Sequence, residues 1–185
     1  MSTIKSEKVV LLGKSGSGKD YLMRKLTEKG LKPGLKTTTR PQRKFEVQGI
    51  TYDFISENIF KDKLNKDEFL VYQEFNVTPE GRDPETWHYG LTKEEFNNSQ
   101  VFIMTPSEFS TIDKESRKGC FIVYLDIDRD IREKRISGRG DKNDSVKRRL
   151  DADEIDFAEF SKSGDYDLRV TDPDFNADDI YDLMA

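Results

Sequence analysis

The sequence has very few of the residues on which disulfide scaffolds and metal centres depend. Among 185 residues there is one cysteine, Cys120, and one histidine, His88. A single cysteine excludes an internal disulfide, and a single histidine excludes a metal site built from several histidines. Cys120 lies in an apolar run, so we expect its thiol to be buried and reduced.

Long apolar segments and an excess of positive charge are absent as well. No run is long enough to cross a membrane, and the first eight residues contain no apolar core of a signal peptide. Charged residues make up 36% of the chain and the net charge is −5, which argues against a general affinity for nucleic acid. We therefore expect a cytoplasmic, single-domain protein without nucleic-acid or membrane partners, either a monomer or a homodimer.

The most informative motif is a glycine-rich stretch that follows an apolar run. The run Val9–Leu12 leads into Gly-Lys-Ser-Gly-Ser-Gly-Lys-Asp, and a helical pattern comes next. A glycine, four residues and Gly-Lys predict a phosphate-binding loop, whose backbone N–H groups and following helix dipole hold phosphates. We expect Lys19 to reach the outer phosphates. The predicted ATP-binding residues are Gly13, Lys14, Ser15, Gly16, Ser17, Gly18, Lys19 and Asp20.

The last position of this loop departs from the usual pattern. It is Asp20, whereas phosphate loops normally carry a serine or threonine whose hydroxyl binds Mg²⁺. A carboxylate is a hard oxygen ligand, so we predict that Asp20 holds the Mg²⁺ that accompanies ATP. The alternative is that Asp20 only caps the N-terminus of the helix, where negative charge is favoured.

Strands that alternate with helices predict an α/β fold of the P-loop NTPase type, with a parallel sheet covered by helices on both faces. Its ligand site is expected at the carboxyl ends of the strands. Strands are expected at about residues 8–12, 35–39, 50–55, 68–75, 100–104, 120–125 and 167–170. Helices are expected at about residues 19–29, 57–65, 106–118, 128–136, 143–160 and 176–183, with a short one after Thr92 and a loop over Asn76–Trp87.

The order and spacing of the motifs resemble guanylate kinase over most of the chain. The matching pieces are Gly13–Lys19, Thr38–Arg40 with Arg43, Glu46–Gly49 with Tyr52 and Phe54, Glu68-Phe69, Tyr89-Gly90, Arg135–Gly140 and Arg148–Leu150. The resemblance implies one domain made of three parts. These are an ATP-binding core at about 1–36, 92–137 and 163–185, an inserted acceptor-binding lobe at about 37–91, and an arginine-bearing lid at about 138–162.

The same resemblance implies a kinase that uses ATP and Mg²⁺ to phosphorylate a nucleoside monophosphate, by default GMP or dGMP. The acceptor phosphate would be held by Arg40, Arg43, Tyr52 and Tyr89, because arginine forks and tyrosine hydroxyls donate well to phosphate oxygens. The charge of the transferred group would be neutralised by Lys19, Arg135, Arg139 and Arg149. Without the resemblance, Arg135 and Arg149 would be taken for solvated helix charges, and Tyr52 for strand packing.

The base-reading half of the acceptor site departs from the family. Guanylate kinases present two carboxylates to the guanine edge, but the corresponding positions here are Val71 and the run Ile103–Pro106, which includes Met104. A valine cannot accept from a guanine N–H, so a non-guanine or modified (deoxy)nucleotide acceptor stays open. Substitute readers are available in Gln73, Glu74, Glu80, Arg82, Trp87, Thr105 and Glu108.

Two further alternatives remain. The chain is also similar, more weakly, to ribose 1,5-bisphosphate phosphokinase, whose acceptor has no base to read. A catalytically inactive binding module on the same scaffold is the other alternative. Such modules usually have damaged phosphate loops, whereas Gly13, Gly18 and Lys19 are intact here.

Overall fold

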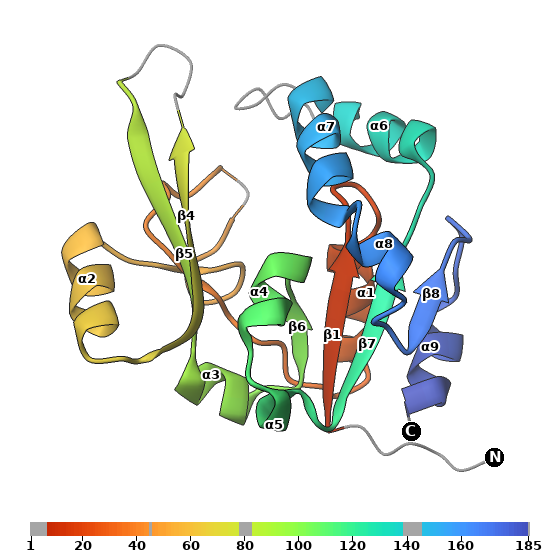
Figure 1. Ribbon diagram of the computed structural model, residues 1–185, viewed down its shortest axis with the longest axis horizontal. Helices are drawn as coiled ribbons and strands as arrows, with labels where there is room; N and C mark the ends of the chain where they lie inside the picture. Colours follow the sequence, from red (N-terminus) through yellow and green to blue (C-terminus); the bar gives the residue numbers. More distant parts are fainter. Residues whose placement is uncertain (1–6, 45, 78–82, 139–145, 185) are drawn as a thin grey trace. The chain divides into compact units, whose positions relative to one another are not determined.

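The computed structural model describes residues 7–44, 46–77, 83–138 and 146–184. The chain divides into two compact units, one formed by Met1–Lys32 with Gln100–Ala185 and the other by Pro33–Ser99. Figure 1 colours both units by their position in the sequence. Within the described ranges, no helix is long and apolar enough to span a membrane.

The first unit is built on a sheet of four strands in the order β6-β1-β7-β8 (Figure 1). All three neighbouring pairs run parallel. The strands are β1 (Lys8–Gly13), β6 (Val101–Ile103), β7 (Cys120–Leu125) and β8 (Leu168–Val170). β1 is an inner strand of this sheet. Its residues after Lys8 are buried whichever face of the sheet they point to, as expected for a strand that is covered on both faces.

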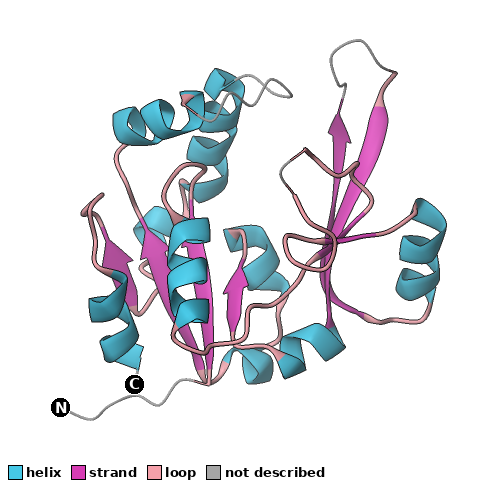
Figure 2. Ribbon diagram, turned by 180° about the vertical axis from the view of Figure 1, so that it is seen from behind, coloured by secondary structure: helices cyan, strands magenta, loops and turns pink. Residues whose placement is uncertain are grey.

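Helices cover both faces of this sheet. On one face, Val9 and Leu11 pack against residues of α1 (Lys19–Glu28) and α9 (Ala177–Met184). On the other face, Tyr124 stacks on Phe157 of α7 (Val146–Phe157). The α1 helix therefore lies behind the sheet in Figure 1 and in front of it in Figure 2. The predicted α/β class, with a parallel sheet between helical layers, is confirmed.

Two predicted helices of the first unit are divided in the structure. The predicted helix at 106–118 is two helices, α4 (Pro106–Thr111) and α5 (Lys114–Arg117). Asp113 starts the second one, because its carboxylate accepts from the amides of Glu115 and Ser116 at 3.0 and 2.9 Å. The predicted helix at 143–160 is described as α7 and α8 (Phe160–Ser163), and residues 143–145 lie outside the described ranges. The predicted helix at 128–136 is α6 (Arg129–Ser137).

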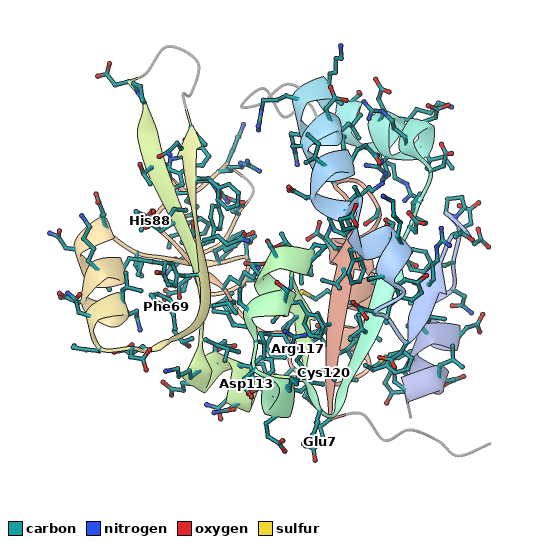
Figure 3. All side chains as sticks on the ribbon, in the orientation of Figure 1. Glu7, Phe69, His88, Asp113, Arg117 and Cys120 are labelled. Carbon is teal, nitrogen blue, oxygen red and sulfur yellow. The ribbon has the colours of Figure 1, made fainter. Side chains whose placement is uncertain are left out.

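The second unit contains a mixed sheet in the order β3-β2-β5-β4. Its elements are β2 (Thr37–Thr38), β3 (Asp53–Phe54), α2 (Glu57–Asn65), β4 (Phe69–Val77), β5 (Glu85–Thr92) and α3 (Lys93–Asn98). Phe60 of α2 stacks on Phe69 with ring centroids 4.4 Å apart, and lies 5.0 Å from the His88 ring. Figure 3 shows Phe69 and His88 beside α2, so these rings form the small core of this unit.

The strand predicted over Ile50–Ile55 is wrong in extent. Only Asp53–Phe54 form a strand, because the chain turns just before it. Gly49 has a positive φ of 74°, and the carbonyl of Val47 accepts from the amides of Ile50 and Thr51 at 3.1 and 2.9 Å. Ile50 is exposed as a result.

The loop predicted over Asn76–Trp87 is also wrong in extent. β4 continues to Val77 and β5 begins at Glu85, so Trp87 lies in a strand. Cross-strand pairs hold this extension together, since Phe75 lies opposite Trp87 and the Thr86 hydroxyl donates to Asn76 Oδ1 at 2.9 Å. The two strands therefore form a longer hairpin than the loop residues indicated.

Candidate active site

The phosphate loop connects β1 to α1 in the first unit. Gly16 and Gly18 have positive φ angles of 77° and 106°, which L side chains rarely adopt. A Cβ added to Gly16 would also lie 2.8 Å from the carbonyl oxygen of Arg132. Gly18 is the N-cap of α1, and no side chain at that position accepts a hydrogen bond from the first amides of the helix. The loop is thus shaped for an anion at a helix N-terminus.

Lys19 and Ser17 lie inside this loop. The Lys19 ammonium donates to the carbonyl of Gly13 and, at 3.0 Å, to that of Lys14. The Ser17 hydroxyl is buried and, within the described chain, has no hydrogen-bond partner. Because an unsatisfied buried hydroxyl costs free energy, this oxygen is suited to a ligand or a water. A Cβ on Gly13 would come within 2.7 Å of it.

Asp20 lies in the first turn of α1 and is exposed. It is not the N-cap, since that position belongs to Gly18. No group of three or more described His, Cys, Asp or Glu side chains is arranged to hold a metal ion. A single carboxylate next to Lys19 nevertheless fits Mg²⁺ that arrives with a nucleotide, because Mg²⁺ usually keeps waters and phosphate ligands and takes one or two protein carboxylates.

Of the three predicted transfer arginines outside the loop, Arg135 is in direct contact with it. Arg135 of α6 donates to the carbonyls of Gly16 and Ser17 at 3.3 Å and to that of Pro173 at 2.7 Å. Arg149 is half-buried on α7. Arg139 lies outside the described residues. The structure thus brings Arg135 to the loop through α6, and places Arg149 on the helix that lies next in sequence.

Three charged residues at the loop were not predicted: Arg132, Asp153 and Glu154. Arg132 is only 1% exposed and donates to Ile127 O at 2.9 Å and to Glu154 Oε1 at 2.5 Å. Asp153 accepts from the Ser15 amide at 2.7 Å, and Glu154 pairs with Lys14. The sequence held one signal, because Arg132 precedes the buried Ile136 by four residues and so lies on the same face of α6.

The charge of Glu154 is maintained by its partners. Burial acts to raise the pKa of its carboxyl group, but the hydrogen bonds and charges of Lys14 and Arg132 outweigh burial, and the pKa lies below its usual 4.5. The carboxylate is therefore ionised at neutral pH, and the cluster contains two cations and two anions.

The predicted acceptor residues of the second unit lie together. Arg40 Nε donates to the Tyr89 hydroxyl at 3.0 Å, and its guanidinium lies 5.5 Å from the Tyr52 ring centroid. The Tyr52 and Tyr89 rings meet edge to face at 5.9 Å. β5 presents Tyr89, while Arg40 follows β2 and Tyr52 precedes β3, so sheet pairing gathers the three side chains from distant parts of the sequence.

Glu46 organises the arginines of this cluster. Its carboxylate accepts from Arg40 Nη1 and Nη2 at 2.9 and 2.7 Å, and from the Arg43 amide at 2.7 Å. Burial acts to lower the pKa of Arg40, but the hydrogen bonds and charge interactions with Glu46 and Tyr89 together outweigh burial and raise the pKa. Glu46 belongs to the matched motif Glu46–Gly49, yet the sequence alone assigned it no role in the site.

The positions expected to read the base are apolar and buried. Val71 lies on β4 opposite Leu91, and Met104 follows β6 in the first unit.

The residues suggested as substitute readers have partners of their own where the structure describes them. Thr105 and Glu108 satisfy each other in a capping box at the start of α4. Glu74 Oε1 is 3.3 Å from His88 Nε2, and the Trp87 indole donates to Glu85 Oε2 at 2.8 Å. Gln73 lies opposite Tyr89, and Glu80 and Arg82 are not among the described residues.

Comparison with known proteins identifies the family of these motifs. Residues 5–183 match the family model described as guanylate kinase. A guanylate kinase from Trichormus variabilis is 32% identical over 180 residues, which cover 91% of this chain and 83% of the relative. A guanylate kinase from Nostoc sp. is 29% identical over 178 residues, with the same two shares. One from Helicobacter pylori is 44% identical over 66 residues, or 35% of this chain and 32% of that protein.

A solved structure agrees with this comparison. The crystal structure of guanylate kinase from Anaplasma phagocytophilum covers 99% of this chain, and this chain covers 87% of it, with a TM-score of 0.63. The two sequences are 17% identical, so this likeness shows the shared fold and nothing finer.

Proposed function

The chain belongs to the guanylate kinase family, and on that premise we propose that it transfers the terminal phosphoryl group of ATP to a nucleoside monophosphate. GMP or dGMP is the default acceptor, giving GDP or dGDP, and the reaction takes place in the cytoplasm. The observation that carries the proposal is the intact phosphate loop, in which Gly16 and Gly18 adopt the required positive φ angles and Lys19 lies over the loop carbonyls.

The donor half of the reaction would use the first unit. Phosphoryl transfer depends on alignment and on neutralisation of charge more than on acid–base chemistry. The loop amides and Lys19 would hold the outer phosphates, and Arg135, Arg139 and Arg149 would neutralise the transferred group. Asp20 would hold Mg²⁺, which when bound with ATP supplies further neutralisation of the phosphate oxygens.

The acceptor half would use the second unit. Arg40, Arg43, Tyr52 and Tyr89 would bind the acceptor phosphate through guanidinium and hydroxyl donors. Glu46 would fix the plane of the Arg40 guanidinium, because it holds both Nη atoms. Transfer then requires an oxygen of that phosphate to lie in line with the terminal phosphoryl group of ATP.

One observation favours a second acceptor class. Val71 and Met104 are buried and apolar at the positions from which carboxylates would read guanine. A non-guanine or modified (deoxy)nucleoside monophosphate, or a sugar phosphate such as ribose 1,5-bisphosphate, would not place the guanine N–H donors unpaired against these side chains. The intact loop argues against a purely binding module.

An acceptor panel tests the proposal. Purified protein with Mg²⁺ and ATP would be assayed for ADP release with each ribo- and deoxyribonucleoside monophosphate and with ribose 1,5-bisphosphate, beside the Lys19→Ala variant as the background. We expect turnover of at least one nucleoside monophosphate. Turnover of ribose 1,5-bisphosphate alone would select the sugar-phosphate kinase, and no turnover together with undetectable ATP binding would select the binding module.

A further inference from the structure

The phosphate loop is already in contact with carboxylates of its own chain. Asp153 Oδ2 accepts from the Ser15 amide at 2.7 Å, and Glu154 is paired with Lys14. Both acceptors come from α7, and both loop residues belong to the first half of the Gly13–Asp20 motif. A carboxylate oxygen bound to a loop amide or to a loop ammonium has the charge and the hydrogen-bonding role of a phosphate oxygen.

Arg132 keeps these carboxylates in place. Its side chain is 1% exposed, and the guanidinium contacts Glu154 Oε1 at 2.5 Å and Asp153 Oδ2 at 3.8 Å. The same side chain donates to the carbonyl of Ser15 at 3.4 Å. The lowered pKa of Glu154 keeps it charged at neutral pH. One buried cation therefore connects the loop, α6 and α7 in a cluster whose anions both come from α7.

We propose that Asp153 and Glu154 are an internal anionic competitor of the nucleotide phosphates, so that ATP binding to the loop is coupled to release of α7. This inference rests on the proposed function of the loop and adds a mode of regulation to it. A triphosphate brought to Ser15 and Lys14 has the same sign of charge as the two carboxylates, and like charges at close range repel each other.

Release of α7 would also act on Arg149. Arg149 lies four residues before Asp153 on the same helix, and residues at that spacing share one helix face. The helix that supplies the competing carboxylate thus also carries a predicted transfer arginine. Release of α7 on ATP binding would therefore let Arg149 change position together with the carboxylates.

A purely structural role for the cluster predicts the opposite binding result. If Asp153 only supported the loop, its removal would loosen the loop and weaken nucleotide binding. If Asp153 competes with phosphate, its removal strengthens binding. The sign of the change therefore decides between the two roles.

The first experiment is calorimetric titration of the full chain with Mg-ATP and, separately, with inorganic tripolyphosphate. We expect Asp153→Asn to lower the Kd of both ligands about fivefold relative to the unmodified protein. Asp151→Asn is the matched control, because Asp151 lies on the same helix but pairs with Arg129 at 2.6 Å on the surface. We expect its Kd to stay within about twofold. Equal or weaker binding by Asp153→Asn, or no tripolyphosphate binding by either protein, overturns the inference.

The second experiment follows hydrogen exchange. In the unmodified protein, ATP should speed amide exchange in α7, and slower or unchanged exchange there overturns the proposal. Glu154→Gln should strengthen tripolyphosphate binding as Asp153→Asn does, which keeps the test valid if one variant folds poorly. The proposed function can fail separately. If the protein binds tripolyphosphate in this competitive way but turns over no acceptor, the inference about Asp153 and Glu154 stands and the kinase assignment is wrong.

Discussion

Arg40 and Glu46 face each other through two hydrogen bonds, Nη1 to Oε2 at 2.9 Å and Nη2 to Oε1 at 2.7 Å. Nη1 also donates to the carbonyl of Pro41, and Nε donates to the Tyr89 hydroxyl. Four of the five guanidinium N–H groups are thus directed at partners within the described part of the second unit. The arginine that the sequence assigned to the acceptor phosphate is held rigidly before any ligand arrives.

Loss of Glu46 should destabilise the second unit and weaken acceptor binding. Arg40 is 4% exposed, so Glu46→Ala would leave a buried charge without its anion and should lower the free energy of unfolding by about 2–4 kcal/mol. The KM for the acceptor should rise, while the KM for ATP should change little. Urea denaturation and steady-state kinetics measure these effects.

Glu57→Ala is the control for that variant. Glu57 pairs with Lys61 on the exposed surface of α2, and solvent and salt screen such pairs so that they contribute little to stability. If Glu46→Ala were no more destabilising than Glu57→Ala, the Arg40–Glu46 pair would not support the fold.

The stability of the protein should depend on acid pH through Glu46. Burial acts to raise the pKa of this carboxyl group, but the hydrogen bonds from Arg40 and the Arg43 amide outweigh burial, and the pKa lies below its usual 4.5. A group with a lowered folded-state pKa stabilises the fold above its unfolded pKa and loses that contribution as pH falls through the folded value. The free energy of unfolding should therefore decrease on acidification below about pH 4.5, and Glu46→Gln should flatten this decrease. Identical pH profiles for the two proteins would contradict the assignment.

Replacement of Lys19 should separate catalysis from folding. Its ammonium donates to the carbonyls of Gly13 and Lys14 within the loop rather than to the apolar core, so Lys19→Ala should shift the melting temperature by no more than a few degrees. The kcat should fall at least about a hundredfold, because a charge stabilising the transferred phosphoryl group is lost. Lys25→Ala, which removes a surface pair with Glu28 on the same helix, should keep full turnover. Retained turnover by Lys19→Ala would defeat the site assignment.

The sequence predicted the phosphate loop well because everything that shapes it is local. An apolar strand, glycines where φ must be positive, and a helix start all fall within about twenty residues. Ile50–Ile55 shows the opposite case. Its alternation of apolar and polar residues is typical of a strand, but Ile50 and Thr51 belong to a turn that begins near Gly49, and their amides donate to the carbonyl of Val47. The alternation of side chains indicates that a segment can form a strand. The length of the strand depends on the partner strand, which the alternation does not indicate.

The pairing of charges around the phosphate loop could not be predicted from the sequence, although the spacing of Arg132 from Ile136 placed Arg132 on the buried face of α6. Glu154 is 140 residues from Lys14 and 22 residues from Arg132. Each of the three is a charged residue of the kind that usually lies on the surface. Only packing of α6 and α7 on the loop turns them into partners. Glu46 differs, because it belongs to a motif that is visible in the sequence. Its bond to Arg40, six residues away, depends on an irregular turn that no pattern predicts.

Gly90 should tolerate no side chain. A Cβ there would lie 2.5 Å from the Phe69 ring, and Phe69 is fixed by its stacking on Phe60. Gly90→Ala should therefore lower the free energy of unfolding by about 1–3 kcal/mol in urea denaturation. Gly138→Ala is the control, since its nearest contact is 3.4 Å away and its φ of −66° suits alanine. It should be neutral or stabilise by up to about 1 kcal/mol. Equal effects would mean that Phe69 moves aside.

Asp20 should determine how much Mg²⁺ the reaction needs. The side chain is exposed in the first turn of α1, where a carboxylate interacts with the helix dipole whether or not it holds a metal. Asp20→Ser should therefore cost at most about 1 kcal/mol of stability under either interpretation, and stability cannot separate them. The Mg²⁺ concentration for half-maximal turnover can separate them. A serine hydroxyl can also bind Mg²⁺ but lacks the charge of a carboxylate, so this concentration should change if Asp20 holds the metal. Asp62→Ser, an exposed carboxylate on α2, should leave the titration unchanged. If the Asp20→Ser curve matches that of the unmodified protein, Asp20 serves only the helix.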